Sequence, residues 1–232
     1  MCCRNRSMAC TCYTIITLLF LFIISMILFW IIISPSNFKF HVTDASLTQF
    51  NLTSNNTLYY NLKVNVTVRN PNKHTIVYYR RITAIAWYKD NDFGMVSLTP
   101  FDQGHKNTTF LQAVFEGHSV IKLKPKQLSE YKEETSVGIY NDLTVDFDLR
   151  IRAKFGRLFK SNRFHPPVVQ CRRLKVPLIF NGKTAPPFSV TRCSAAYFFS
   201  NRDAKVQADG NAFSYITINQ EKSRWVFLTL FH

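Results

Sequence analysis

Residues 143–155 read LTVDFDLRIRAKF, and apolar and polar side chains alternate along this run without a break. Seven apolar residues, from Leu143 to Phe155, fall on one face, and six polar residues, from Thr144 to Lys154, fall on the other. A period of two puts successive side chains on opposite faces of a strand, here one dry and one wet. Such strict alternation is typical of an antiparallel sheet with one covered face. The stretch therefore predicts a mainly β fold, an antiparallel β-sandwich.

Strand patterns recur before this run, and one short segment has helical spacing. The strand-like runs are Leu62–Arg69, Thr75–Tyr79, Ile82–Tyr88, Thr109–Phe115 and Ser119–Leu123. The run Ile82–Tyr88 is apolar on both faces, which indicates a central strand. In Pro125–Thr135, Leu128 and Tyr131 lie one turn apart among charges, which predicts a short helix.

The first of these strands ends abruptly at Asn70-Pro71-Asn72. Pro71 has no backbone N–H and fixes φ near about −65°. Asparagine side chains can hydrogen-bond their own backbone, which favours turns. We therefore expect a corner that ends one strand and starts its neighbour. A recognition role for the exposed loop, with Lys73 and His74 beside it, is the alternative.

The stretch Tyr13–Ile33 has 21 residues and no charge. As a helix rising about 1.5 Å per residue it would span roughly 30 Å, the thickness of a bilayer core. We therefore predict a transmembrane signal-anchor helix over residues 13–33. A cleaved signal peptide is the competing interpretation, but it should have a shorter apolar region and a small-residue cleavage site.

Four N-x-[ST] sequons follow the apolar stretch, at Asn51, Asn55, Asn65 and Asn107. Glycosylation needs the non-cytosolic side of a membrane, so four sequons within 57 residues orient the chain. Residues 1–12 become a cytosolic tail, and the remainder becomes extracellular. Arg4 and Arg6 before the helix give the same direction weakly.

The six cysteines divide along the same line. The cytosolic end carries four of them, which are candidates for palmitoylation, with unmodified thiols as the alternative: Cys2, Cys3, Cys10 and Cys12. Cys171 and Cys193 are the two on the extracellular side, and a lone pair in an oxidising compartment predicts a disulfide.

Several segments together resemble a known family. They are VTDASLTQFNLT, YYNLKVNVTVRNPNKHTIVYY, PFDQGHKNTTFL, CRRLKVPL and FSVTRC, in that order. Over about residues 1–193 the chain is similar to the plant harpin-induced, hypersensitive-response-associated (NDR/HIN-like) proteins. Their module is the late-embryogenesis-abundant group-2 domain, also called the water-stress and hypersensitive-response (WHy) domain. Asn70, Pro71 and Asn72 match the family's hallmark turn.

The resemblance implies a plasma-membrane protein that acts in pathogen and stress responses by binding, without catalysis. It implies an external antiparallel β-sandwich of about seven strands with a short helix, here over residues 38–199. The chain departs from the family at Arg80-Arg81 and at Arg172-Arg173, which add positive charge. Residues 200–232 have no family counterpart and form an atypical C-terminal tail. This tail is either a gene-model artefact or an evolved extension, and we expect that it could be disordered.

The sequence offers little catalytic chemistry, and we expect no enzyme, cofactor or metal site. No HExxH, P-loop, G-x-S-x-G or GxGxxG motif occurs. Asp146 and Asp148 share one face of a strand, and paired carboxylates can cleave glycosides. Because Arg150 and Arg152 continue the same row, surface ion pairing is the favoured interpretation. A ligand role for His105 is the remaining minor alternative.

The formal charge is +15, and only two of the 29 basic residues and none of the 14 acidic ones precede Ser34. The predicted extracellular part therefore carries +13, which attracts anions through a screened field. With this topology nucleic acid is excluded. Acidic cell-wall polysaccharide and anionic lipid are the candidate partners, beside protein partners in defence signalling; a merely solvated basic surface is the alternative. The candidate basic runs are Arg80-Arg81, Lys122-Lys124-Lys126, Arg150-Arg152-Lys154 and Arg172-Arg173-Lys175.

The leading hypothesis is accordingly a membrane-anchored glycoprotein that supports defence and stress signalling by binding. A membrane-to-wall tether or stress protectant is the second hypothesis.

Overall fold

The computed structural model describes residues 3–33, 35–157, 159–179, 188–194 and 196–204, without the side chains of residues 3–12 and 29–33. The chain falls into two compact units, Met1–Pro35 and Ser36–His232. The four cysteines predicted to be palmitoylated lie outside the described side chains. Within the predicted C-terminal tail, residues 200–204 are described and residues 205–232 are not.

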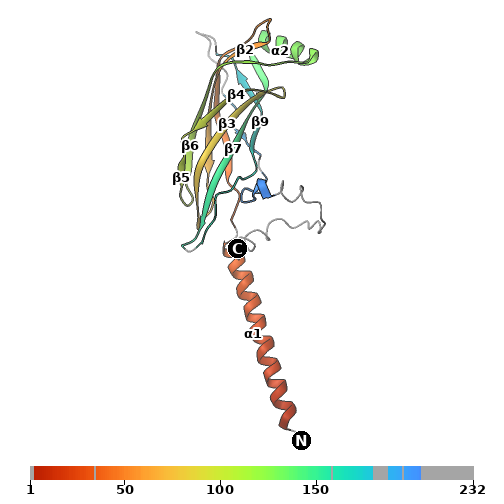
Figure 1. Cartoon of the computed structure of the whole chain (residues 1–232), viewed down its shortest axis with the longest axis vertical. Coiled ribbons are helices and arrows are strands. Elements are labelled where there is room, and N and C mark those ends of the chain that lie inside the picture. Colours follow the sequence, from red (N-terminus) through yellow and green to blue (C-terminus); the bar gives the residue numbers. More distant parts are fainter. Residues whose placement is uncertain (1–2, 34, 158, 180–187, 195, 205–232) are drawn as a thin grey trace. The chain divides into compact units, whose positions relative to one another are not determined.

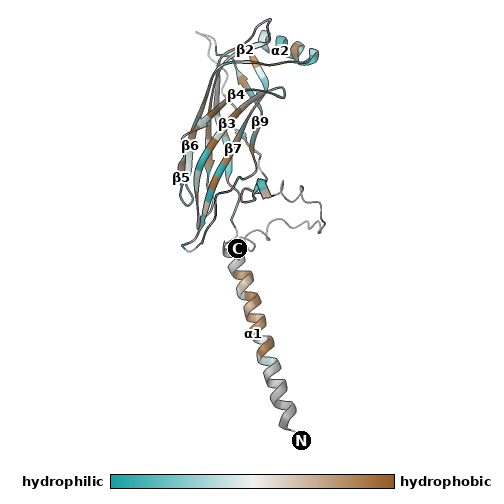
Figure 2. Cartoon of the chain, viewed as in Figure 1, coloured by the Kyte–Doolittle hydropathy of each residue, from teal (hydrophilic) through white to brown (hydrophobic). Residues whose placement is uncertain are grey.

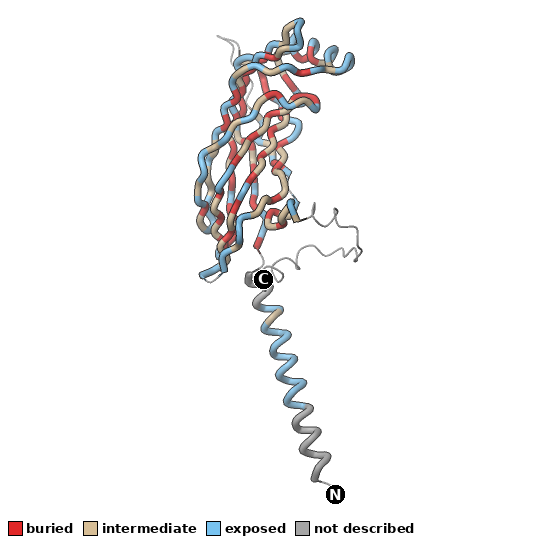
Figure 3. Tube along the Cα trace, in the orientation of Figure 1, coloured by how far each residue is buried: buried red, intermediate tan, exposed pale blue. Residues whose placement is uncertain are grey.

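The first unit contains helix α1, Cys3–Ile33 (Figure 1). Its described side chains, from Tyr13 to Leu28, are exposed except for the half-buried Met26 (Figure 3). In the part of the chain that the structure describes, no helix combines the length and the apolar character that crossing a membrane requires. The anchor over residues 13–33 and the cytosolic tail stay predictions.

The described part of the second unit contains ten strands and the helix α2. The elements are β1 Lys39–Leu52, β2 Thr57–Arg69, β3 Thr75–Tyr88, β4 Asn91–Leu98, β5 Phe101–Gln103, β6 Thr108–Val120, α2 Pro125–Val137, β7 Ile139–Phe155, β8 Phe159–Lys160, β9 Val169–Pro177 and β10 Thr191–Arg192. The helix predicted over Pro125–Thr135 is therefore confirmed, and it ends at Gly138 in the left-handed conformation that glycine tolerates best.

The strands form two antiparallel sheets that curl into a half-barrel around one core (Figure 1). Sheet A has the order β10-β1-β2-β6. Sheet B has the order β4-β3-β7-β8, with β5 also paired to β3 and β9 also paired to β7. The predicted mainly β, antiparallel class is confirmed. Of the described strands, seven have eight residues or more, while β5, β8 and β10 have two or three.

The alternation in residues 143–155 covers all of β7 except its first four residues. Its inward residues from Leu143 to Ala153 are at most 1% exposed, and Phe155 packs at the margin of the core. The outward row stays in contact with water, and Figures 2 and 3 show the same alternation in hydropathy and burial along the strands. Because β7 pairs with β3, β8 and β9, it is the central strand of sheet B.

Two predicted pairs of strands are each one continuous strand. Thr75–Tyr79 and Ile82–Tyr88 together form β3, interrupted by a bulge between Tyr79 and Arg81. Likewise Thr109–Phe115 and the first two residues of Ser119–Leu123 belong to β6. The glycine between them, Gly117, has φ +151° and lies opposite Tyr60, whose ring it allows to approach closely.

Strand β1 was not predicted, and its geometry explains why. Its pairing with β2 has register shifts between Val42 and Asp44 and between Leu47 and Gln49. Each shift inserts a residue and so breaks the period-two pattern by which strands are recognised.

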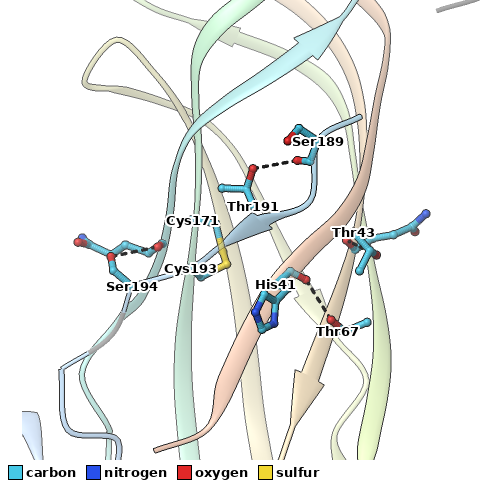
Figure 4. The surroundings of a disulfide bond; sticks show 10 residues. His41, Thr43, Thr67, Cys171, Ser189, Thr191, Cys193 and Ser194 are labelled. Atoms are coloured by element: carbon cyan, nitrogen blue, oxygen red, sulfur yellow. Dashed lines mark hydrogen bonds between the residues drawn. A yellow bond between two sulfur atoms is a disulfide. The ribbon is translucent and has the colours of Figure 1, made fainter. Parts of the chain in front are cut away.

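A disulfide joins Cys171 of β9 to Cys193, which follows β10 (Figure 4). Since β9 belongs to sheet B and β10 to sheet A, the bond staples the two sheets. Reciprocal backbone hydrogen bonds of 2.8 Å between Gln170 and Ser194 lie beside it. The predicted pairing of these cysteines is the one that the structure has.

Replacing both cysteines by serine should lower the free energy of unfolding by about 3 kcal/mol, because the unfolded chain regains the entropy of an unclosed loop. Urea unfolding of the wild type and of Cys171→Ser/Cys193→Ser measures this difference. Adding a reductant should destabilise the wild type and leave the double variant unchanged. Equal responses of the two proteins would contradict a stabilising role of the disulfide.

Candidate functional sites

The Asn-Pro-Asn corner between β2 and β3 is buried. Asn70 has no exposed surface, and its Nδ2 donates to Thr75 O and to Gly104 O, both at 2.8 Å. Its Oδ1 accepts from Asn72 N at 3.0 Å and from Asn72 Nδ2 at 3.1 Å. All four hydrogen bonds that one carboxamide can form are therefore made within the protein.

Asn72 extends the same network to the start of the domain. Its Oδ1 accepts from Ser36 N at 2.6 Å, and its Nδ2 donates to Ser36 O at 2.9 Å. The carbonyl of Asn72 accepts from Lys106 N at 3.1 Å. The corner thus binds together three chain segments that are distant in sequence: Ser36, the β2–β3 connection and the β5–β6 connection.

The corner also reaches the end of β5. Gln103, likewise without exposed surface, donates from Nε2 to Val68 O at 2.7 Å and accepts from the buried Tyr79 hydroxyl at 3.3 Å. The prediction of a corner that separates two strands is confirmed. The sequence suggested that its asparagines bond their own backbone, and Asn72 N does donate to Asn70 Oδ1. The side chains also bond Ser36 and Gly104, which are distant in sequence. We assign the motif a structural role, while Lys73 and His74 stay exposed.

Asn70→Ala and Asn70→Asp should each lower the free energy of unfolding by about 2–4 kcal/mol, since buried carbonyls lose their donor. Asp at position 70 faces two carbonyl oxygens, so its carboxyl pKa should be raised. The stability of Asn70→Asp should then fall as pH rises through the unfolded value near about 4.

Urea unfolding at pH 4 and pH 7 tests both variants, with the exposed Lys73→Ala as the control. An Asn70→Ala variant as stable as the control would contradict the structural role and would favour a recognition turn.

A second buried polar cluster attaches α2 to the β3–β4 hairpin. Lys89 lies in the hairpin turn with φ +46°, and its side chain is 5% exposed. Its Nζ is 2.6 Å from Glu130 Oε2 and 3.5 Å from Glu134 Oε1. Tyr88 donates its hydroxyl to Glu134 Oε2 at 2.7 Å. The carboxylate of Glu134, which is 9% exposed, therefore has both a cation and a neutral donor.

Burial by itself would lower the pKa of Lys89, but the bond to Glu130 and the charge of Glu134 raise it overall. The bond from Lys89 also lowers the pKa of Glu130, whereas burial raises the pKa of Tyr88. The shifts in the pKa values of Lys89 and Glu130 both favour the charged forms of that pair.

Lys89→Met should cost about 2–4 kcal/mol of unfolding free energy, because Glu134 would lose its cation while staying buried. A folded-state pKa raised above 10.5 means that the lysine stabilises below pH 10.5 and that the effect is lost above it. The lowered Glu130 pKa means that the effect also shrinks as pH falls below 4.5.

Chemical denaturation at pH 4, 7 and 10 measures the difference, with Lys132→Met on the exposed side of α2 as the control. The difference between wild type and Lys89→Met should be smallest at pH 4. A constant difference would mean that the lysine acts by packing alone.

The four predicted glycosylation sites lie on strands of sheet A or in the connections that lead into them. Asn51 is exposed on β1, Asn55 is exposed in the β1–β2 turn, and Asn107 is exposed just before β6. Asn65 lies mid-strand on the outer face of β2, and its Nδ2 donates to Asp44 Oδ2 at 3.2 Å. Figure 1 shows β2 and β6 side by side in this sheet. Glycosylation of these residues stays a prediction.

The two carboxylates considered for acid–base chemistry do not work as a pair in the structure. Asp148 lies 3.6 Å from Arg81 and 2.9 Å from Arg202, so it is engaged in ion pairs, although not with Arg150 and Arg152 of its own row. Burial raises the pKa of Asp146, and the nearby Arg172 opposes this rise. Among the described residues no group of three His, Cys, Asp or Glu side chains could hold a metal ion.

Two of the basic runs meet on the outer face of sheet B around Tyr78. Tyr78 pairs with Arg152 across β3 and β7, and Lys154 pairs with Lys160 across β7 and β8. The guanidinium carbon of Arg80 lies 5.2 Å from the centre of the Tyr78 ring, and Lys160 Nζ lies 5.1 Å from it. We call these five residues, Tyr78, Arg80, Arg152, Lys154 and Lys160, the Tyr78 patch.

The bulge in β3 explains why Arg80 and Arg81 are both exposed although they are consecutive. A regular strand would have turned one of them inward. Lys160 was missed because it belongs to no basic run, and only the β7–β8 hairpin brings it to Tyr78. Arg202 was assigned to the atypical tail, yet it reaches Asp148.

Comparisons with known proteins show which proteins this chain is similar to. The family model described as "Late embryogenesis abundant protein" matches residues 65–171. The chain is 45% identical over 172 residues to NDR1/HIN1-like protein 10 of Arabidopsis thaliana, covering 73% of this chain and 74% of that protein. It is 40% identical over 184 residues to NDR1/HIN1-like protein 3 of the same plant, covering 79% and 78%.

Solved structures are less similar. A solution structure of an Arabidopsis thaliana protein aligns over 62% of this chain and 84% of that chain, with 17% identity and a TM-score of 0.33. A crystal structure of an Archaeoglobus fulgidus protein aligns over 63% and 99%, with 12% identity and a TM-score of 0.29.

Proposed function

We propose, from the premise that this chain belongs to the NDR1/HIN1-like family, that it is a plasma-membrane-anchored, non-enzymatic binding protein of plant defence and stress responses. Family membership and the late-embryogenesis-abundant domain support a role related to defence or stress. Membership is the single observation that carries the proposal. The anchor, the orientation and the mechanism are the parts that we add.

The anchor is supported by the 21 uncharged residues of Tyr13–Ile33. Their described side chains, up to Leu28, are exposed apolar groups for the most part, and a hydrocarbon environment would cover them. With the N-terminus in the cytosol, Asn51, Asn55, Asn65 and Asn107 would be available for glycosylation. We therefore propose that the β domain is extracellular.

Action by binding is supported by the chemistry of the described polar groups. The buried carboxamide of Asn70 makes four hydrogen bonds and that of Asn72 makes three, all in holding the corner. Glu134 is neutralised by Lys89. Asp148 is occupied by two arginines. The named relatives carry no enzyme names. Partners in defence signalling would then be recognised by the surface of the domain.

A second candidate function is a membrane-to-wall tether or stress protectant that binds acidic polysaccharide or anionic lipid. The observation that favours it is the excess of exposed cations on the outer face of sheet B. Pull-down from solubilised plant membranes separates the two: a stoichiometric receptor or channel favours signalling, whereas retention on acidic polysaccharide alone favours tethering.

In plant-expressed protein, endoglycosidase digestion should increase electrophoretic mobility, and the protein should sediment with membranes after a carbonate wash. Each of the variants Asn51→Gln, Asn55→Gln, Asn65→Gln and Asn107→Gln should remove part of the digestible mass. Asn5→Gln is the matched control, since its sequon Asn5-Arg6-Ser7 would stay cytosolic. A mobility that digestion does not change would show that the proposed orientation is wrong.

The role itself is tested by silencing the gene and challenging the plant with a pathogen. We expect a weaker hypersensitive response, restored by the full-length chain. An undiminished response in silenced plants, with close relatives silenced as well, would contradict the defence role while leaving the topology intact.

A further inference from the structure

The outer face of sheet B presents cations around one aromatic ring. Tyr78 is half-buried on the outer side of β3, so its side chain is partly accessible from outside. Arg80 and Lys160 approach the ring at 5.2 and 5.1 Å, within the range of cation–π attraction. Arg152 lies opposite Tyr78 in the register, and its Nε donates to Ser161 O at 2.8 Å. The patch is therefore organised by the fold.

The cations of the Tyr78 patch are poorly neutralised. Arg80 has a long, exposed contact of 3.6 Å with Asp102, a geometry that contributes little. For Arg152, Lys154 and Lys160, no carboxylate of the described residues lies within ion-pair distance. Cations that are held near one another without acidic partners favour the binding of an anionic ligand.

The opposite face of the half-barrel has a different character. The described strands of sheet B contain no sequon, whereas the four predicted glycosylation sites lie on strands of sheet A or in the connections that lead into them. Bulky glycans on Asn51, Asn55, Asn65 and Asn107 would cover that side and leave sheet B free. The distribution of the sequons thus divides the domain into a shielded sheet and an accessible one.

We propose that the Tyr78 patch is a binding surface for an acidic polysaccharide, a polymer of uronic acid residues. The cations would pair with successive carboxylates, and the Tyr78 ring would pack against the apolar face of a sugar ring. This inference rests on the proposed extracellular position of the domain and adds to it the ligand class and the surface that binds it.

A linear polyanion fits the patch better than a single lipid headgroup does. Arg152 and Lys154 are two residues apart on β7, so their side chains leave the sheet about 7 Å apart along the strand. Arg80 and Lys160 flank them on the neighbouring strands β3 and β8. The charges are therefore spread over the face of a sheet, which suits repeated carboxylates along an extended chain.

The test compares two triple variants of the full-length chain in a neutral detergent, with polygalacturonate as the probe. The patch variant is Arg80→Gln/Lys154→Gln/Lys160→Gln, which spares the bond between Arg152 and Ser161. The matched control is Lys39→Gln/Lys63→Gln/Arg192→Gln, three exposed cations of sheet A. Both variants lose three positive charges, so overall attraction falls equally.

The patch variant should bind polygalacturonate about tenfold more weakly than wild type, the sum of three ordinary surface ion pairs. The control should bind within about twofold of wild type, and the wild-type affinity should fall as salt rises. Tyr78→Leu, which keeps every charge, should weaken binding about threefold to fivefold through loss of the ring. Neutral dextran should not bind.

Three results would overturn the proposal. Equal losses in the two triple variants would mean a diffuse basic surface. Stronger binding to phosphatidylserine vesicles than to polygalacturonate, lost in the patch variant, would assign the patch to lipid headgroups. A large gain in polygalacturonate binding after endoglycosidase treatment would place the binding face on sheet A. Circular dichroism and urea unfolding confirm that each variant is folded.

Failure here is distinguishable from failure of the proposed function. Suppose that polygalacturonate does not bind, while endoglycosidase digestion still changes the electrophoretic mobility and silencing still weakens the defence response. Then only the assignment of the ligand is wrong. If digestion does not shift the mobility, the extracellular position falls first.

Discussion

A buried carboxamide must find all its hydrogen-bond partners inside the protein. In this domain, the side chain of Asn70 is such a group, and its partners must therefore be held in place around it. Its four bonds require Asn72, the start of β3 and the β5–β6 connection to lie in fixed positions. Strand β3 begins within this network at Thr75, which accepts from Asn70 and is also the first residue of β3 that pairs with β7. The amide therefore lies where β3 enters sheet B, the sheet whose outer face carries the Tyr78 patch.

The other end of the domain is fixed by a different kind of interaction. There Lys89 and Glu134 are buried as an ion pair, and α2 is attached to the β3–β4 hairpin through them. A neutral network at one end and a charged one at the other hold the apolar core between them. Both networks are short, local in space and distant in sequence. Hydrophobic burial gives the core its stability, while these polar groups select one arrangement of strands.

Much of the fold could be predicted from the sequence, because period-two patterns survive wherever strands are regular. The run Leu143–Phe155 predicted β7 and its dry face correctly, and Val64, Val66 and Val68 did the same for β2. The bulges in β1 and β3 could not be predicted, since an inserted residue destroys the period from which strands are read. Sequence places Arg80 and Lys160 far apart; only the strand register, which no local pattern encodes, brings them to Tyr78. The corner was expected to be a turn, but its burial depends on distant segments such as Ser36 and Gly104.

The bonds between Asn72 and Ser36 have one further consequence, which concerns force. Ser36 is the first residue of the β domain, so any tension carried along the chain from the residues before it arrives there ahead of β1. The two hydrogen bonds and the Asn-Pro-Asn corner would bear this force before the first backbone hydrogen bonds between β1 and β2 do. A domain fastened in this way resists being peeled open strand by strand from its N-terminal end.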